Sequence, residues 1–143
     1  MGNYFVNGNT EVSSISHEYL GINNPHDLYM ALSHCWSIET CAPRMRDKWS
    51  KENYTCGQCS ITAFLFQDIF GGEVFGVALG DGNYHCYNVI NDSIFDLTSE
   101  QFGDTKLSYD SINPQSREVH FMKQEKYERY LLLKKKLKEY LNV

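Results

Sequence analysis

The sequence lacks the features that mark nucleic-acid-binding, membrane and secreted proteins. Its 143 residues carry a formal net charge of −5, which disfavours a broad basic face for nucleic acid. No apolar run is long enough to span a membrane, and the N-terminal segment has no basic leader followed by an apolar core. Val6 stands where a myristoylation motif on Gly2 would need Ser or Thr. We therefore expect a cytoplasmic protein without a membrane or nucleic-acid partner.

The cysteine count also does not fit a disulfide framework, which typically has an even number. The chain has five, which are Cys35, Cys41, Cys56, Cys59 and Cys86. In a reducing compartment they are thiols, zinc ligands or catalysts rather than cross-links. Internal repeats and low-complexity linkers are missing as well, so the length predicts a single domain over residues 1–143. With 42% hydrophobic and 14% aromatic residues, this domain can build a core without covalent staples.

Residues 59–70 predict a central, buried helix, because they are apolar on nearly every face. Thr55 and Gln58 match a capping box at its start, with Thr at the cap and Gln three residues later. The glycine pair Gly71 and Gly72 supplies the positive φ with which helices commonly end.

Two further helices are expected at either end of the chain. Asn24 can cap the first, over residues 23–37, with Pro25 at the first helical position. The second covers residues 124–141. Its expected apolar side consists of Tyr127, Tyr130, Leu131, Leu137 and Leu141.

Short strands separated by turn residues follow the central helix. The runs 73–79, 83–90 and 93–99 are joined by "GDG" and "ND", which predict an antiparallel meander. The segment "REVHFM" (117–122) suggests a fourth strand, and a short strand is expected near residues 4–6. The fold class is therefore α+β, with the buried helix packed on an antiparallel sheet and flanked by other helices.

Cys59, His85 and Asp96 form the candidate catalytic set. The first turn of a helix offers unpaired N–H groups and a positive dipole end, which lower the pKa of a thiol such as Cys59. His85 lies on the middle predicted strand and can act as the base, and Asp96 on the next strand can orient the imidazole. A tight turn at 91–92 puts residue 85 opposite about 97–98, so the register is consistent with contact between His85 and Asp96.

A nucleophile on a helix N-terminus, then His, then a carboxylate is the order found in papain-like and transglutaminase-like hydrolases. "GQCSITAFLFQDIFGGEVF", "YHCYNVI" and "IFDLTSEQF", with the earlier "CWSIET", resemble the YunG family of small bacterial proteins. The family pattern is GQC-[AS]-x-TA…QD-x-x-GGE, then HYWN, then (D/E)-x-DLT-x-x-QF. Cys86 and Tyr87 depart from it where Tyr and Trp are usual, and we interpret both as packing changes.

This resemblance implies a papain-like cysteine hydrolase fold with Cys59 as nucleophile, His85 as general base and acid, and Asp96 as orienting group. The N–H of Cys59 would be one oxyanion donor, and the Gln58 side chain a second unless the capping box uses it. The reaction would be acyl transfer through a thioester to water or an amine, with no metal or cofactor. The acyl or amide substrate and the oligomeric state are not indicated.

Several alternatives stay open on the sequence alone. The same fold could serve as a non-catalytic binding module with a vestigial triad, in which Cys59 is a buried structural thiol. Cys56 could be a bystander, a resolving thiol, or half of a CxxC redox pair, although Pro114 is the only later proline available to face such a site. Cys35, Cys41, Cys56 and Cys59 with His34 make a loose zinc candidate with poor spacing.

Overall fold

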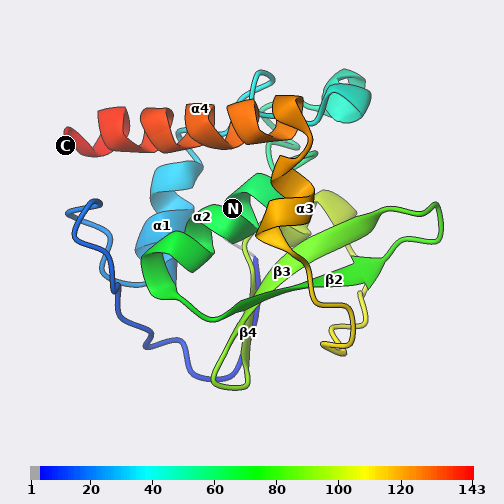
Figure 1. The fold of residues 1–143 in the computed structure, drawn as a ribbon, viewed down its shortest axis with the longest axis horizontal. Coiled ribbons are helices and arrows are strands. Elements are labelled where there is room, and N and C mark those ends of the chain that lie inside the picture. The colour runs from blue at the N-terminus through cyan, green and yellow to red at the C-terminus, as the bar shows by residue number, and fades with distance from the viewer. Residues whose placement is uncertain (1–3) are drawn as a thin grey trace.

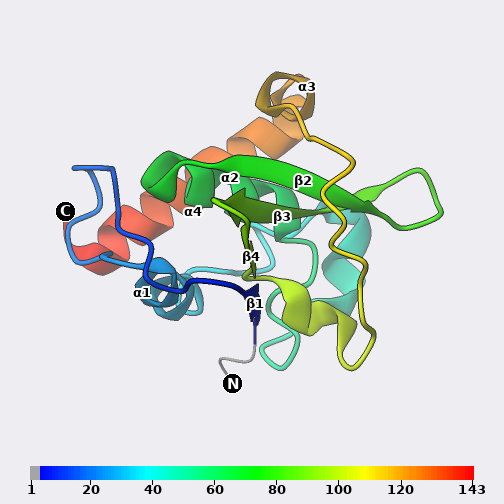
Figure 2. The same ribbon diagram turned by 90° about the horizontal axis from the view of Figure 1, so that it is seen from below.

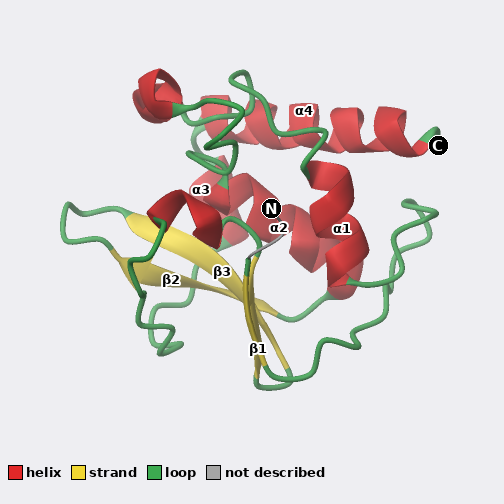
Figure 3. Ribbon diagram, turned by 180° about the vertical axis from the view of Figure 1, so that it is seen from behind, coloured by secondary structure: helices red, strands yellow, loops and turns green. Residues whose placement is uncertain are grey.

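The computed structural model describes residues 4–143, so the expectation about Gly2 lies outside the described residues. Helix α2 (Cys59–Phe70) lies between a four-stranded antiparallel sheet and the long helix α4 (Gln124–Leu141), as Figure 1 shows. Seen from behind, the main helices lie on one side of the sheet (Figure 3). The predicted α+β class is confirmed at this level.

The sheet has the spatial order β1-β4-β3-β2, and β1 lies beside β4 at one edge (Figure 2). Its strands are β1 (Phe5–Asn7), β2 (Glu73–Ala78), β3 (Tyr84–Ile90) and β4 (Ser93–Asp96). The predicted meander is therefore confirmed, except that its third strand ends at Asp96 rather than at 99. There the chain turns into the 3₁₀ helix η2 (Ser99–Phe102).

The turn between β3 and β4 sets the register that brings His85 and Asp96 together. Asn91 and Asp92 have φ values of 49° and 69°, the positive values that a tight two-residue hairpin requires. Phe95 consequently pairs with Asn88. This register carries Asp96 to the end of β4 beside the strand that holds His85.

Helix α2 is the central element of the core, as predicted. Nine of its twelve residues are buried, so it has no solvent-facing side. The predicted capping box is wrong: Gln58 itself is the N-cap and makes no side-chain cap, and the Thr55 hydroxyl has no partner within residues 4–143. The reason is that the Gln58 amide donates instead to the carbonyl of Ser37, 3.0 Å away.

Helix α1 (Pro25–Leu32) begins as expected, with Asn24 Oδ1 accepting the N–H of Asp27 at 2.8 Å. It ends five residues before the predicted end, yet Cys35 and Trp36 remain buried because turns continue the chain along the core. The 3₁₀ helix η1 (Pro43–Lys48) then leads toward α2.

The segment predicted as a fourth strand is instead helix α3 (Arg117–Phe121). Ser116 explains the difference, since its hydroxyl accepts the N–H of Val119 and caps the helix. The predicted apolar side of α4 is partly wrong as well, because Tyr127 and Leu131 are 39% and 43% exposed. The buried face of α4 consists of Arg129, Tyr130, Leu133 and Leu137.

Within residues 4–143, no helix combines the length and the apolar character that crossing a bilayer would need.

Candidate active site

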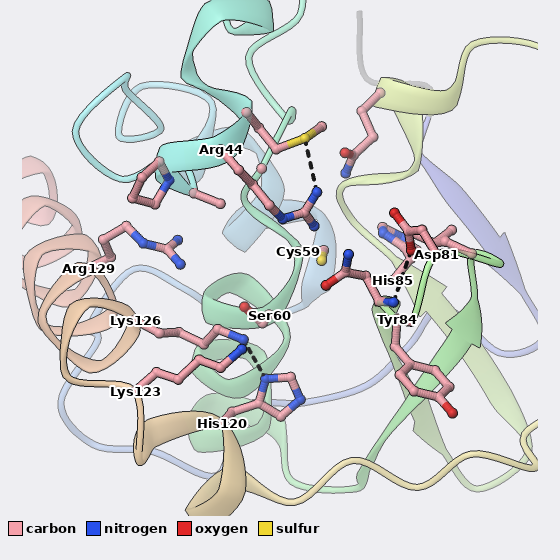
Figure 4. Close-up of a pocket in the computed structure, with 18 of the residues that line it drawn as sticks. Arg44, Cys59, Ser60, Asp81, Tyr84, His85, His120, Lys123, Lys126 and Arg129 are labelled. Atoms are coloured by element: carbon pink, nitrogen blue, oxygen red, sulfur yellow. Dashed lines mark hydrogen bonds between the residues drawn. The ribbon is translucent and has the colours of Figure 1, made fainter.

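Cys59 is the first residue of α2 and lies beside His85 of β3 (Figure 4). The first intrahelical bond runs from Thr62 N–H to the Gln58 carbonyl, so the N–H groups of Cys59 and Ser60 have no acceptor within the helix. Cys59 is only partly buried, and it lines a pocket. Its sulfur is thus placed at the positive end of the helix dipole and open to a substrate.

Gly57 allows the segment just before α2 to pack tightly against residues 41 and 42. Its φ is +71°, and a Cβ there would lie 2.5 Å from Cys41 Sγ and 2.9 Å from the Ala42 nitrogen. A side chain at residue 57 therefore has no room, whatever its size. Gly57 also lines the pocket.

His85 and Asp96 meet beneath this pocket. Nε2 of His85 lies 2.6 Å from Oδ2 of Asp96, and each side chain is 1% exposed. Burial opposes the charged imidazole, but the charge and hydrogen bond of Asp96, with those of Cys59, outweigh it and raise the pKa of His85 to about 10. Since Nε2 is engaged by Asp96, Nδ1 is the ring nitrogen left for the sulfur.

The thiol of Cys59 is stabilised as a thiolate. A hydrogen bond from the Cys86 thiol is the largest cause, and with the His85 imidazole it holds the pKa of Cys59 well below its ordinary value against the opposing effect of burial. The same contact, with burial, raises the pKa of Cys86, which keeps its proton. The structure thus brings together Cys59, His85 and Asp96, and it adds Cys86.

Three further residues hold the pair of His85 and Asp96 in place. The Tyr109 hydroxyl donates to Asp96 Oδ2 at 2.7 Å, and the Thr98 N–H donates to Oδ1 at 3.2 Å. The Phe102 ring packs edge-on to the imidazole, with 4.6 Å between centroids. Thr98 and Phe102 lie in the "DLT…QF" motif that the sequence offered as a signal. Tyr109 lies in an irregular segment, and no pattern pointed to it.

Gln58 is adjacent in sequence, but its side chain does not line the pocket. It is fully buried, and its amide nitrogen donates to the Ser37 carbonyl. The structure therefore places this side chain against the backbone that follows α1 rather than beside the sulfur of Cys59.

The two sulfurs of Cys56-Gly57-Gln58-Cys59 have different partners. Cys56 is buried, its thiol lies 3.9 Å from the Met45 carbonyl, and it accepts a hydrogen bond from the Cys41 thiol. Cys59 instead interacts with Cys86. All five cysteines are free thiols, and no group of three or more Cys, His, Asp or Glu residues within the described part of the chain could hold a metal ion.

The pocket above Cys59 and His85 has a volume of about 800 Å³. Two of its walls come from segments far apart in the sequence, namely η1 and the region around α3 and the start of α4 (Figure 4). On the second wall, Lys126 Nζ donates to His120 Nδ1 at 2.9 Å, and His120 Nε2 lies 2.8 Å from Gln115 Oε1. Burial, then the charge of Lys126, lowers the pKa of His120 to about 4, so its ring is neutral. Nothing in the sequence indicated this network, because its members come from different elements.

Two comparisons with known proteins find similarity. The family described as "YunG protein" matches residues 24–142. The chain is also similar to a protein of Bacillus subtilis (strain 168) described as "Uncharacterized protein YunG", with 45% identity over 75 residues. That alignment covers 52% of this chain and 63% of the relative, so less than two thirds of the relative's length is spanned. No solved structure matches the chain.

Proposed function

The chain belongs to the YunG family, and we propose that it is a small cysteine hydrolase or acyl/amidotransferase that acts through a thioester on Cys59. One observation carries the proposal: Cys59 at the start of α2 and His85 both line an open pocket, and the Asp96 carboxylate binds His85 from beneath it. A buried helix with its nucleophile at the N-terminus, packed on the antiparallel sheet that supplies base and carboxylate, also supports a papain-like or transglutaminase-like core.

In the first step, the Cys59 thiolate attacks the carbonyl carbon of an ester or amide. A C–S bond forms, and the π pair of the carbonyl moves onto its oxygen. The N–H groups of Cys59 and Ser60, which have no acceptor within the helix, are the oxyanion donors in this proposal. Collapse of the intermediate breaks the bond to the leaving group, which takes the proton of the His85 imidazolium.

In the second step, neutral His85 takes a proton from water or an amine. The resulting nucleophile attacks the thioester carbon, and the C–S bond breaks. Thiolate and imidazolium are restored, so protons and electrons balance over the cycle. Asp96 holds the ring in the orientation both steps need and stabilises its charge.

The proposal is tested by alkylation with iodoacetamide between pH 5 and 9, with the modified site mapped by mass spectrometry. Cys59 should react selectively below pH 7, and His85→Ala should move the midpoint toward the ordinary thiol value of about 8.5. The other cysteines are a built-in control, since all four are buried. Reaction of wild-type Cys59 only near pH 8.5 would favour the non-catalytic module instead, and a readily formed Cys56–Cys59 disulfide would favour the redox alternative.

A second readout separates an enzyme from a merely reactive thiol. A generic activated ester, p-nitrophenyl acetate, should release one equivalent of nitrophenol rapidly and then turn over more slowly as the thioester hydrolyses. Cys59→Ser should abolish the burst, and Asp96→Asn should slow it by at least about tenfold by releasing the imidazole. A burst that survives Cys59→Ser would refute the assignment of the nucleophile.

A further inference from the structure

The pocket above Cys59 is strongly basic, although the chain as a whole is acidic. Five Lys and Arg side chains line it, against two carboxylates, while the formal net charge of the protein is −5. The five are Arg44, Lys48, Lys123, Lys126 and Arg129. This imbalance is local and is not a consequence of bulk composition.

Most of these cations form no ion pair, although the charge of Arg44 helps to lower the pKa of Asp81, which also lines the pocket. Arg129 is 6% exposed and is committed to the structure, since it pairs with Glu125 at 2.5 Å and donates to the Thr40 carbonyl. Arg44, Lys48, Lys123 and Lys126 form no ion pair within residues 4–143. Gathering like charges round one hollow is unfavourable in the empty protein, because each desolvated charge repels the next.

The thiolate accounts for only part of this positive charge, since the charge of Cys59 raises the pKa of Lys126 while no Lys or Arg is among the causes that lower the pKa of Cys59. Hydrogen bonds from Cys86 and His85 are the main causes that lower the pKa of Cys59. The cations stand instead on the pocket walls, with Arg44 on η1 and Lys123 and Lys126 on the facing side (Figure 4). They surround the space that a bound substrate would fill.

Lys126 is the best placed of them. It is partly buried, and one of its three N–H donors is held by neutral His120, which is itself held by Gln115. This chain fixes the ammonium at the pocket wall and leaves two donors for a ligand. Burial is the largest cause that lowers the pKa of Lys126; Cys86 and Cys59 oppose it and Lys123 adds to it. An anion bound beside the ammonium would therefore stabilise its charged form.

We propose that the acyl substrate of Cys59 carries a second, anionic group, a carboxylate or a phosphate, which binds between Arg44 and the pair of Lys123 and Lys126. This inference rests on the proposed function and narrows its substrate class. Arg suits the planar, bidentate recognition of either group, and Lys supplies a point charge to both.

The test compares two alkylating agents that differ in charge. The rates of Cys59 with anionic iodoacetate and neutral iodoacetamide are measured at pH 7 and low salt, and their ratio is divided by the same ratio for 2-mercaptoethanol. Both reagents require the thiolate, so effects on its pKa cancel and the ratio reports the field of the pocket alone. We expect a normalised ratio of about 10 or more, falling as salt screens the charges. The His85 imidazolium contributes to this ratio as well, so the share of the wall cations is the part that their removal abolishes.

The double variant Lys123→Gln/Lys126→Gln should lower this ratio at least about threefold. Arg44→Gln, which removes a positive charge on the opposite wall, should lower it as well. The matched control is Lys106→Gln/Lys135→Gln, which makes the same change in net charge at two exposed residues outside the pocket. It should leave the ratio unchanged. Thermal melts of each variant show that the fold is retained.

A normalised ratio near 1, a ratio unchanged by the pocket variants, or an equal drop in the control would overturn the anionic subsite. Cys59 would still react with iodoacetamide below pH 7 in that case, so the thioester proposal would survive. No reaction of Cys59 below pH 7 with either reagent would instead defeat the proposed function itself.

Protection experiments then distinguish the two sources of the anion. Inorganic phosphate and glutarate are each added before iodoacetamide, with sodium chloride at matched ionic strength as reference. Slower alkylation with phosphate alone assigns a phosphate group, and slower alkylation with glutarate alone assigns a carboxylate. Protection by both supports an anionic group of either kind. Protection by neither would mean that the cations attract anions without binding one at a defined position, which would overturn the subsite.

Discussion

The hydroxyl of Tyr109 donates to the same oxygen of Asp96 that accepts from His85. The two bonds to Oδ2 are 2.7 Å and 2.6 Å long, and Asp96 is almost completely buried. Burial, then the charge of Asp96, raises the pKa of Tyr109, so its hydroxyl stays protonated and stays a donor at neutral pH. A long, irregular segment after β4 thus completes the shell round the carboxylate.

Tyr109→Phe removes this donor and keeps the ring stacked on Phe5, 4.3 Å away. A hydrogen bond to a buried charge contributes about 1.5–3 kcal/mol, so the unfolding free energy at pH 7 should fall by about that amount. Denaturant unfolding monitored by circular dichroism measures it. The matched control is Tyr84→Phe, whose ring is 42% exposed, and we expect a change within about 0.5 kcal/mol. Equal effects in both variants would mean that Tyr109 does not stabilise the carboxylate.

Cys86 is expected to act on Cys59 although it touches no substrate in the proposed mechanism. Cys86→Ala removes the main hydrogen bond to the thiolate, so the pKa of Cys59 should rise and its alkylation profile should move to higher pH. The shift is measured as the midpoint of the iodoacetamide rate against pH. Cys35→Ala also deletes a buried thiol but lies in the core away from the pocket, and should leave the midpoint in place. A Cys86→Ala profile identical to wild type would show that His85 alone holds the thiolate.

Cys59 should make stability depend on pH in a definite sense. Its native pKa lies below the unfolded value of about 8.5, so between the two values the unfolded chain binds more protons at this site. The stabilisation is fully present above about pH 8.5 and is lost as pH falls through the native pKa. The unfolding free energy of wild type minus that of Cys59→Ser should therefore grow as pH rises toward 8.5, by at most about 1.4 kcal/mol per pH unit. It should fall again as pH rises through the pKa of His85 at about 10, which Cys59 helps to raise.

Cys35→Ser is the control for this experiment, because the pKa of Cys35 is shifted in the opposite direction. Burial raises the pKa of Cys35 to about 11, so its contribution is present below about pH 8.5 and is lost as pH rises through the native value. The difference between wild type and Cys35→Ser should consequently shrink above pH 8.5. Parallel curves for the two serine variants would contradict the depressed pKa of Cys59.

The local parts of this molecule were predictable, because the signals for them are local. Asn24 and Pro25 fixed the start of α1, and the Asn91-Asp92 turn fixed the register that carries Asp96 toward His85. Apolar character on every face identified α2 as central. These choices depend on neighbouring residues, which the sequence shows directly.

The missed parts depend on contacts between distant segments. The Gln58 amide goes to Ser37, 21 residues earlier, which no capping rule can anticipate. Ser116 turned a strand-like segment into α3, and Cys86 became a hydrogen-bond partner of Cys59 rather than a packing change. Each of these outcomes depends on which hydrogen-bond donors and acceptors the folded chain brings next to one another.

Gln58 offers the sharpest test of how the oxyanion is held. If its side chain is structural, Gln58→Met should keep the volume but lose the bond to the Ser37 carbonyl, which lowers the unfolding free energy by about 1–3 kcal/mol. Acylation by p-nitrophenyl acetate should stay within about threefold of wild type, since the N–H groups of Cys59 and Ser60 remain. Loss of an oxyanion donor would instead slow acylation by about 10²–10³. Such a loss, with iodoacetamide alkylation unchanged, would show that the Gln58 amide turns into the pocket during the reaction and that the resting hydrogen bond to Ser37 is broken to reach it.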